Sequence, residues 1–295
     1  MSTLKCKIAG HVVEVEFLEA HNDSSLLPSF QPFVLPAEDE SRATLHVTVD
    51  DRFDFETKGK EVGQFDCGGC NHGVYVLEDG SYQFEVGDVK GEICSLMQSN
   101  PDFSHCQVAL RGKTFSQRNY GLNNAMMMAF AFCYATQGTL LVHASVIRKD
   151  GYGYLMTAPS GTGKSTHTHL WYKNIPGCDL MNDDNPIVRV LEGGEAVIYG
   201  SPWSGKTPCY RNIQAPIGAF VRIQQRPKNE IRLMPAIEAF TTLLPAASSM
   251  KWDKRVYTAI CGTISALISR VKVFELGCLP NAEAAHVCYE AVRRC

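Results

Sequence analysis

Apolar and polar positions alternate with a period of two along parts of the first 115 residues, which is typical of half-buried β-strands. The dipeptide Asp79-Gly80 lies between two apolar runs and favours a hairpin turn, because such a turn needs positive φ. The segment 24–41 carries prolines and polar ends and is predicted to be a loop. The expected strands are 12–18, 43–49, 74–77 and 82–86. We therefore expect a β-rich region built as an antiparallel sheet with long connections.

The pattern changes near Ser116. Residues 119–134 are rich in Ala, Met, Leu and Phe, which favours a long buried helix. Apolar runs at 139–147 and 152–157 flank Asp150-Gly151 and predict a second hairpin. The other expected strands are 179–181, 187–191, 196–199 and 217–223, and the other expected helices are 164–172, 236–244, 252–269 and 282–293. This half of the chain is therefore expected to be mixed α/β.

Composition and charge support a division of the chain into two parts. Of the 295 residues, 45% are apolar and 20% are charged, which excludes disordered, collagen-like and coiled-coil classes. Residues 1–115 contain 19 acidic and 9 basic residues, whereas residues 116–295 contain 12 and 19, so formal charges of −10 and +7 make up the net −3. We therefore expect a β-rich domain of unassigned role at 1–115 and an α/β domain at 116–295. The basic part suits a nucleic acid or a small polyanion such as a nucleotide, unless its charges are only solvated surface.

The chain carries no sequence signal for export or for a membrane. The first 18 residues lack a basic stretch followed by an apolar core, and no apolar run reaches the roughly 18 residues that a membrane span needs. We therefore expect a cytoplasmic protein without a membrane partner, whose 12 cysteines stay reduced.

The most informative stretch is the glycine-rich turn at 158–166, which follows an expected strand and precedes an expected helix. Its sequence is close to the phosphate-loop pattern G-x-x-x-x-G-K-[ST], although Ala158 replaces the first glycine and would resist a positive φ. Lys164 can reach the β- and γ-phosphates of a nucleotide, and Ser165 is placed to bind Mg²⁺. The candidate nucleotide-binding residues are Ser160, Gly161, Thr162, Gly163, Lys164, Ser165 and Thr166. ATP and Mg²⁺ are therefore the expected ligands.

Two adjacent carboxylates, Asp183 and Asp184, lie 19 and 20 residues after Lys164. A phosphate-loop enzyme needs a carboxylate there to hold Mg²⁺, and a kinase gains from a second one that accepts the proton of the attacking hydroxyl. The alternative is a solvated turn, because residues 182–186 have a turn-rich composition. With the loop upstream, the pair favours phosphoryl-transfer chemistry.

These features resemble the catalytic domain of HPr kinase/phosphorylase, which is itself similar to the nucleotide core of phosphoenolpyruvate carboxykinase. Residues 160–164 carry the same Ser-Gly-Thr-Gly-Lys core as the carboxykinase loop, and His143 occupies the place of a histidine on the strand that enters the hairpin. The kinase pattern Gly-x-x-Leu-x-x-Asp-Asp-Asn is matched by Gly177, Leu180, Asp183, Asp184 and Asn185. The resemblance is best over 139–191 and implies a P-loop kinase domain with a mixed sheet and flanking helices.

The resemblance also implies a role for each residue. Lys164 would contact the phosphates, and Ser165 and Asp183 would bind the metal. Asp184 would deprotonate the acceptor hydroxyl, and His143 would lie by the transferred phosphoryl group, unless it is simply a buried strand histidine. The Glu-x-Arg-Gly-Leu-Gly type segment of the bifunctional HPr kinases is missing, so neither HPr as substrate nor phosphorolysis is expected. The chain is also much shorter than the carboxykinases, so decarboxylation is not expected.

A second candidate surface lies at 200–208 and resembles a Gly-Thr-Pro-Trp-x-Gly-Lys segment of small HPr-kinase-like proteins. Lys206 is a candidate to stabilise charge on the transferred phosphoryl group. Trp203 could form a wall of the acceptor pocket, and Arg211 is a weaker candidate for that pocket. The alternative is a plain surface loop with a packed tryptophan.

Two weaker signals lie outside these motifs. Cys67, Cys70 and His72 offer three soft metal ligands, but a structural zinc site usually needs four, and ordinary thiols beside a tight turn or a redox pair fit as well. The basic cluster at 251–255 is too short to indicate nucleic-acid binding.

The sequence therefore predicts an ATP- and Mg²⁺-dependent kinase that transfers the γ-phosphoryl group to a serine-like hydroxyl of a protein, a peptide or a small molecule. The alternative is a nucleotide-binding sensor or regulatory module without transfer chemistry. No nucleic-acid partner is expected. A homo-oligomer stays an open option, because dimers and hexamers occur in the resembling family.

Overall fold

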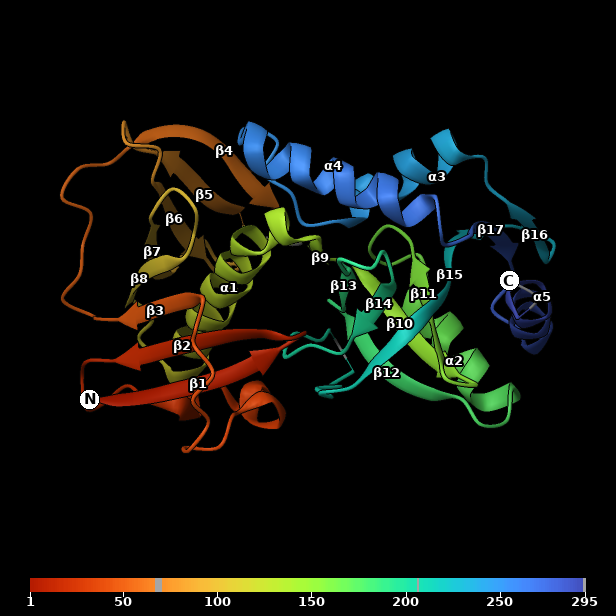
Figure 1. Cartoon of the computed structure of the whole chain (residues 1–295), viewed down its shortest axis with the longest axis horizontal. Helices are drawn as coiled ribbons and strands as arrows, with labels where there is room; N and C mark the ends of the chain where they lie inside the picture. The colour runs from red at the N-terminus through yellow and green to blue at the C-terminus, as the bar shows by residue number, and fades with distance from the viewer. Residues whose placement is uncertain (67–70, 206, 294–295) are drawn as a thin grey trace. The chain divides into compact units, whose positions relative to one another are not determined.

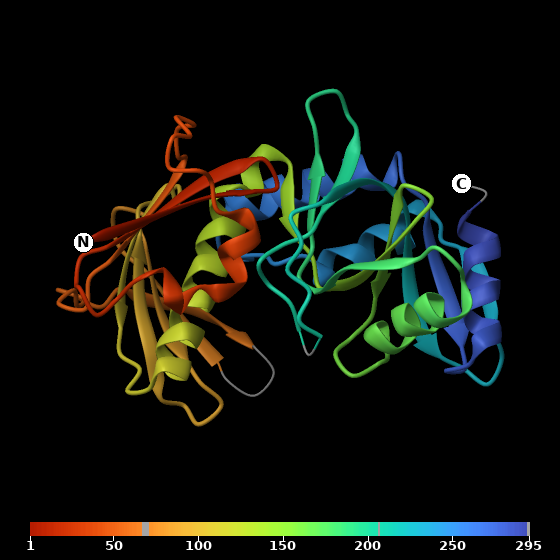
Figure 2. The ribbon, with the colours of Figure 1, turned by 90° about the horizontal axis from the view of Figure 1, so that it is seen from below.

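The computed structural model describes residues 1–66, 71–205 and 207–293, and the chain is mixed α/β (Figures 1 and 2). It forms two compact units, Met1–Cys133 and Tyr134–Cys295. The boundary predicted at 115/116 is therefore corrected to a position after Cys133. The reason is that helix α1 (Phe115–Cys133) packs with the first unit.

An eight-stranded sheet forms the core of the first unit, in the order β1-β2-β3-β8-β7-β6-β5-β4. The expectation of an antiparallel sheet is wrong in its centre, because β2 pairs with β3 and β3 with β8 in parallel. The connection between β2 and β3, predicted as a plain loop, includes two short 3-10 helices that bury Leu26, Phe30 and Phe33. The strands are β1 (Ser2–Ile8), β2 (His11–Phe17), β3 (Leu45–Val49), β4 (Lys60–Asp66), β5 (Asn71–Val76), β6 (Tyr82–Gly87), β7 (Ile93–Ser99) and β8 (His105–Leu110), and the 3-10 helices are η1 (Ser24–Leu26) and η2 (Pro28–Phe33).

Helix α1 lies close against this sheet. A Cβ at Gly121 would stand 2.8 Å from the backbone carbonyl atoms of Cys94, so only glycine permits the approach. The Ser95 hydroxyl on β7 donates to the Gly121 carbonyl at 2.9 Å. The apolar composition that predicted a buried helix is thus explained by a sheet that precedes the helix in sequence.

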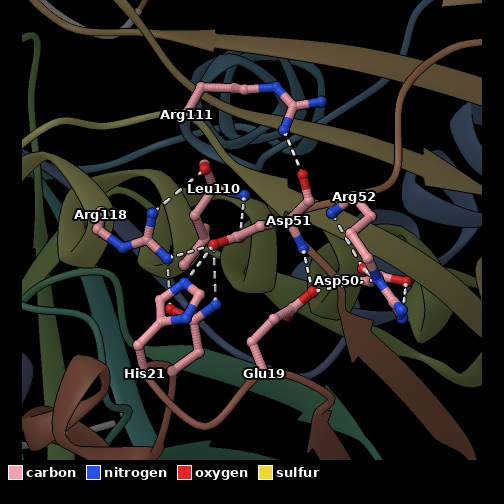
Figure 3. A network of polar contacts seen from close by, with 9 residues as sticks. Glu19, His21, Asp50, Asp51, Arg52, Leu110, Arg111 and Arg118 are labelled. Atoms are coloured by element: carbon pink, nitrogen blue, oxygen red, sulfur yellow. Dashed lines mark hydrogen bonds and ion pairs between the residues drawn. The ribbon is translucent and has the colours of Figure 1, made fainter.

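A carboxylate, Asp51, ties the ends of three elements together (Figure 3). Its oxygens accept hydrogen bonds from Arg118 on α1 (2.6 Å) and from the Leu110 amide at the end of β8 (3.0 Å). Its carbonyl accepts one from Arg111 (2.7 Å). Burial alone would raise the pKa of Asp51, but the hydrogen bonds from Arg118 and His21 outweigh it and lower that pKa. The ionised carboxylate therefore fixes the start of α1 to the sheet.

The second unit has a nine-stranded sheet, and strand β15 pairs with different strands along its length. The start of β15 pairs with β14, and its later residues pair in parallel with β11 and β17. The predicted hairpin at 150–151 is confirmed by the antiparallel pair β10–β11, but the apolar run 139–147 is divided into β9 and β10. The strands are β9 (Thr139–Leu141), β10 (Ala144–Lys149), β11 (Tyr152–Thr157), β12 (Asp179–Asp184), β13 (Ile187–Val190), β14 (Ala196–Tyr199), β15 (Gln214–Gln225), β16 (Glu230–Leu233) and β17 (Val273–Cys278).

Helices cover this second sheet on both faces. Trp171 on α2 and Cys288 on α5 join a buried cluster with Met156, Val221 and Leu276 of the sheet, and Figures 1 and 2 show α2 and α5 side by side. Alternate strand residues point to the other face, where the sheet meets α3. The helices are α2 (Lys164–Asn174), α3 (Ala236–Leu243), α4 (Lys254–Ile268) and α5 (Ala282–Val292), with short 3-10 turns η3 (Ala135–Gln137) and η4 (Leu244–Ala246). None of the helices in the described ranges combines the length and the apolar character needed to cross a membrane.

Candidate functional site

The glycine-rich turn connects the end of β11 to the start of α2. Gly161 and Gly163 have φ of 78° and 113°, values that favour glycine. A Cβ at Gly161 would meet no atom within 4 Å, so the backbone conformation and not the available space requires glycine there. Ala158 does not adopt a positive φ, so its methyl group costs no strain. The departure from the phosphate-loop pattern is therefore compatible with the loop conformation.

Lys164 opens α2 and is 8% exposed. Its Nζ donates to the carbonyl of Ala158 at 3.1 Å, which is its one hydrogen bond within the described part of the chain. Two of its three N–H donors are therefore left for a ligand. Burial lowers the pKa of Lys164, and the charges of Asp184 and Asp183 oppose that effect. The ammonium thus lies in the field of both carboxylates.

Ser165 and Asp183, both predicted as metal ligands, contact each other directly. The Ser165 hydroxyl donates to Asp183 Oδ1 at 2.8 Å. Asp183 is held by the pairing of β12 with β10, which sets it opposite Ser145. A hydroxyl and a carboxylate side by side are oxygen ligands of the kind Mg²⁺ takes together with phosphate oxygens and water. The residues therefore fit the ion, as two ligands that need a nucleotide to complete the shell.

His143 and Asp184 form a second pair at the same end of the sheet. His143 Nε2 lies 3.1 Å from Asp184 Oδ1, and the two side chains are 41% and 36% exposed. The alternative that His143 is a buried strand histidine is therefore wrong. Asn185 Nδ2 donates to the other Asp184 oxygen at 2.8 Å. Asp184 also has φ of 122°, which costs a non-glycine residue about 1–3 kcal/mol and is typical of functional positions.

A buried amide, missed at the level of sequence, ties the loop after β14 to the acid pair. Asn182 is 0% exposed, and its Nδ2 donates to Ser201 Oγ (3.2 Å) and to the Trp203 carbonyl (3.1 Å). Its Oδ1 accepts from the Asn185 amide at 3.1 Å. The available signal was a polar residue in an apolar strand directly before two acids. Asn182 therefore sets the position of the turn that carries Asp184.

The same loop packs against the backbone of Asp183 and the side chain of Asp184. The Ser204 hydroxyl donates to the Asp183 carbonyl at 2.8 Å. A Cβ at Gly205 would lie 3.0 Å from Asp184 Cβ, so glycine allows the loop to come this near. Lys206, predicted to stabilise the transferred phosphoryl group, lies outside the described residues.

Two predicted acceptor-pocket residues are placed elsewhere. Trp203 is 2% exposed and offers a ligand almost no surface, so it is a packed residue. Arg211 pairs with Asp179 (2.7 Å) and with the Leu180 carbonyl, both at the start of β12. The acid pair lies three to five residues further along that strand, about 10–16 Å away for a rise of about 3.3 Å per residue. Neither residue is therefore part of the site.

A cavity of about 510 Å³ adjoins the glycine-rich turn, within the size range of ligand pockets. The buried His167 lines it, and its Nε2 accepts from Trp171 Nε1 (3.2 Å), so a neutral ring carries its proton on Nδ1. Nδ1 has no hydrogen-bond partner among the described residues. On the far side, Gln225 Nε2 donates to the Thr162 carbonyl at 3.2 Å. The cavity thus has mainly apolar walls, from Leu170 and Ile223 among others.

The structure shows no metal site around the candidate ligands Cys67, Cys70 and His72 within the described ranges. Cys67 and Cys70 lie outside them, and His72 is buried, which lowers the pKa of its ring. No group of three or more His, Cys, Asp or Glu side chains is arranged to hold a metal ion in residues 1–66, 71–205 and 207–293.

Comparisons with known proteins add little to this geometry. No protein-family model matches the chain, and no curated protein matches it. One solved structure that matches is the HPr(Ser) kinase/phosphatase from Coxiella burnetii, with 13% sequence identity, a TM-score of 0.30, and coverage of 52% of this chain and 94% of that one. A similarity this weak carries no argument about function, so a functional assignment has to rest on the contacts within the site.

Proposed function

We propose that this chain is an ATP- and Mg²⁺-dependent phosphotransferase that acts on a hydroxyl group, with the P-loop kinase fold expected for residues 139–191. The observation that carries the proposal is the meeting of two side-chain pairs at one end of the sheet, Ser165 with Asp183 and His143 with Asp184. The glycine-rich turn and the Lys164 ammonium lie beside them. Cation, metal ligands and a half-exposed carboxylate are the parts that phosphoryl transfer requires.

The nucleotide is assigned to the cavity of about 510 Å³. Its base and ribose would lie against Leu170 and Ile223. The phosphates would follow the turn toward Lys164, where the backbone N–H groups and the start of α2 favour negative charge. When bound at Ser165 and Asp183, Mg²⁺ would neutralise charge on the β- and γ-phosphates.

Asp184 is assigned the role of general base. The acceptor hydroxyl gives its proton to the Asp184 carboxylate while its oxygen forms a bond to the γ-phosphorus, and the bond from that phosphorus to the leaving ADP oxygen breaks. The contacts to His143 and Asn185 hold the carboxylate in one orientation. The positive φ at Asp184 supports this assignment, because backbone strain of this kind is found at functional sites, where it fixes the direction of a side chain.

The test is transfer from γ-phosphate-labelled ATP to serine-containing peptides and small hydroxy compounds, with Mg²⁺. The variant Asp184→Asn should reduce transfer about 100-fold or more, because general bases contribute that much, and should leave ATP affinity within a few-fold of the wild type. Asp150→Asn, which removes an exposed carboxylate from the β10–β11 turn, is the matched control and should transfer normally.

Equal transfer by wild type and Asp184→Asn would overturn the assignment of the base. Tight ATP binding without transfer to any acceptor, and without hydrolysis, would instead indicate a nucleotide-binding sensor or regulatory module.

A further inference from the structure

An arginine, Arg222, interrupts the apolar core strand of the second unit. Its neighbours Val221 and Ile223 are buried in the cluster under α2 and α5. Because successive strand residues point to opposite faces, Arg222 points to the face that α3 covers. The pairing of β11 with β15 sets it opposite Thr157, the last residue before the glycine-rich turn. A long cationic side chain is thus placed directly beneath the phosphate loop.

Arg222 lines a cavity of about 280 Å³. The cavity is bounded by His143, by the start of the turn at Ala158, and by Thr242 on α3. Among the described residues, the guanidinium donates one long hydrogen bond, to Thr242 Oγ1 at 3.4 Å. It is in none of the ion pairs formed by the described residues. The carboxylate opposite it on β17, Glu275, is paired with Arg226 and Arg232, and Glu238 acts on Arg222 only at longer range. A half-buried arginine therefore faces a small cavity with most of its five donors free for a ligand.

The cavity lies on the opposite side of the sheet from the nucleotide cavity. Ile223 and Gln225 line the larger cavity, whereas Arg222 lines the smaller one. The turn forms part of both walls, with Ala158 on one side and Gly161 to Gly163 on the other. His143, which contacts Asp184, opens onto the smaller cavity. An acceptor bound there would approach the end of the phosphate chain next to the assigned base.

We propose that this cavity binds a carboxylate of the acceptor, which Arg222 and Thr242 hold close to the hydroxyl that becomes phosphorylated. The inference rests on the proposed function, since it names the acceptor class of the same site. A cavity of about 280 Å³ is below the usual range for whole ligands, so it suits a hydroxy-acid group and not a nucleotide. Arginine binds planar carboxylates through paired N–H donors, which gives both charge and orientation. The acceptor is therefore a hydroxy acid, free or at the end of a peptide.

Binding to the full chain can be measured by calorimetry with three probes, without any turnover. D-glycerate carries a hydroxyl and a carboxylate, glyceramide lacks the charge, and inorganic phosphate represents the phosphoryl group as an alternative source of negative charge. Glycerate should bind the wild type about tenfold or more tightly than glyceramide or phosphate, because bidentate, charge-assisted hydrogen bonds are stronger than neutral ones. Arg222→Gln should weaken glycerate by a similar factor, and Arg222→Lys by less. Arg293→Gln, at the exposed end of α5, is the matched control.

ATP affinity of the same variants is measured in parallel, and Arg222→Gln should leave it unchanged. Equal binding of glycerate and glyceramide, no glycerate binding by the wild type, or unchanged glycerate affinity in Arg222→Gln would overturn the inference. Phosphate that binds as tightly as glycerate would assign the cavity to the phosphoryl group and overturn it too. Failed phosphoryl transfer with intact, Arg222-dependent glycerate binding would reject the proposed function alone.

Discussion

The histidine His167 on α2 makes the stability of the second unit depend on pH. It is 2% exposed, and burial lowers the pKa of its ring from 6.5 to about 4. The folded unit therefore keeps the neutral ring, whereas the unfolded chain takes up a proton near the ordinary pKa. Between these two values the unfolded state binds more protons, so stability is complete above pH 6.5 and falls as the pH drops toward 4.

The size of this effect can be calculated from the pKa shift. Each pKa unit is worth a little over 1 kcal/mol, so the full loss is about 3 kcal/mol, most of which is reached at pH 4.5. His167→Gln removes the titration while its amide oxygen can still accept the Trp171 N–H. The free energy of unfolding of the wild type should therefore drop by about 2–3 kcal/mol more than that of the variant between pH 7.5 and 4.5.

Urea unfolding followed by tryptophan fluorescence measures this difference. All three tryptophans, Trp171, Trp203 and Trp252, belong to the second unit, so the signal reports on that unit. His169→Gln, which removes an exposed imidazole from the same helix, is the control and should keep the pH dependence of the wild type. The same drop in wild type and His167→Gln would refute the reasoning from burial.

Further predictions concern backbone approach and the buried network. Arg118→Gln removes the hydrogen bonds to Asp51 and Asn22 and should destabilise the first unit by about 2 kcal/mol in thermal unfolding. The control Arg52→Gln, at an exposed arginine, should change the stability little. Equal losses in the two variants would contradict the role of the Asp51 network. Gly200→Ala places a Cβ 2.0 Å from the Arg211 carbonyl oxygen and should lower the free energy of unfolding of the second unit by about 2 kcal/mol. The control Gly193→Ala, whose Cβ would meet no atom within 4 Å, should leave that free energy unchanged. Similar unfolding midpoints for the two variants would show that the backbone relaxes around the new Cβ. Ala158→Gly should leave ATP affinity unchanged in calorimetry, because Ala158 does not adopt a positive φ; a large gain would mean that the methyl group hinders the loop.

Local signals predicted the parts of the fold and site that are set by local chemistry. The turn at Asp150-Gly151 and the glycines at 161 and 163 adopt the positive φ that their residue types favour. The pattern of an apolar strand, a glycine-rich turn and a helix was sufficient to place Lys164 and Ser165 at the start of α2. The pairing of Ser165 with Asp183 required in addition that β12 return beside β10, which no local signal indicated.

Features that depend on distant strands were not predictable in this way. The parallel pairs around β3 and the attachment of α1 to the preceding sheet arise from contacts between segments far apart in the sequence. Trp203 was assigned to a pocket because it lies in a turn-rich loop, but Asn182 holds the Trp203 carbonyl and the ring is buried. Arg222 could have been noticed as a lone charge in an apolar strand, yet only the topology shows which face it occupies.

The most direct measurement is a crystal structure of the full chain with Mg²⁺ and an ATP analogue that cannot transfer its γ-phosphoryl group. We expect the base near Leu170 and His167, the γ-phosphate within hydrogen-bond distance of Lys164 Nζ, and the metal on Ser165 and Asp183. The Asp184 carboxylate should face the side of the γ-phosphorus that is opposite the bond to the leaving ADP oxygen. A nucleotide bound elsewhere, or a metal held without Ser165 and Asp183, would contradict the proposed phosphotransferase site.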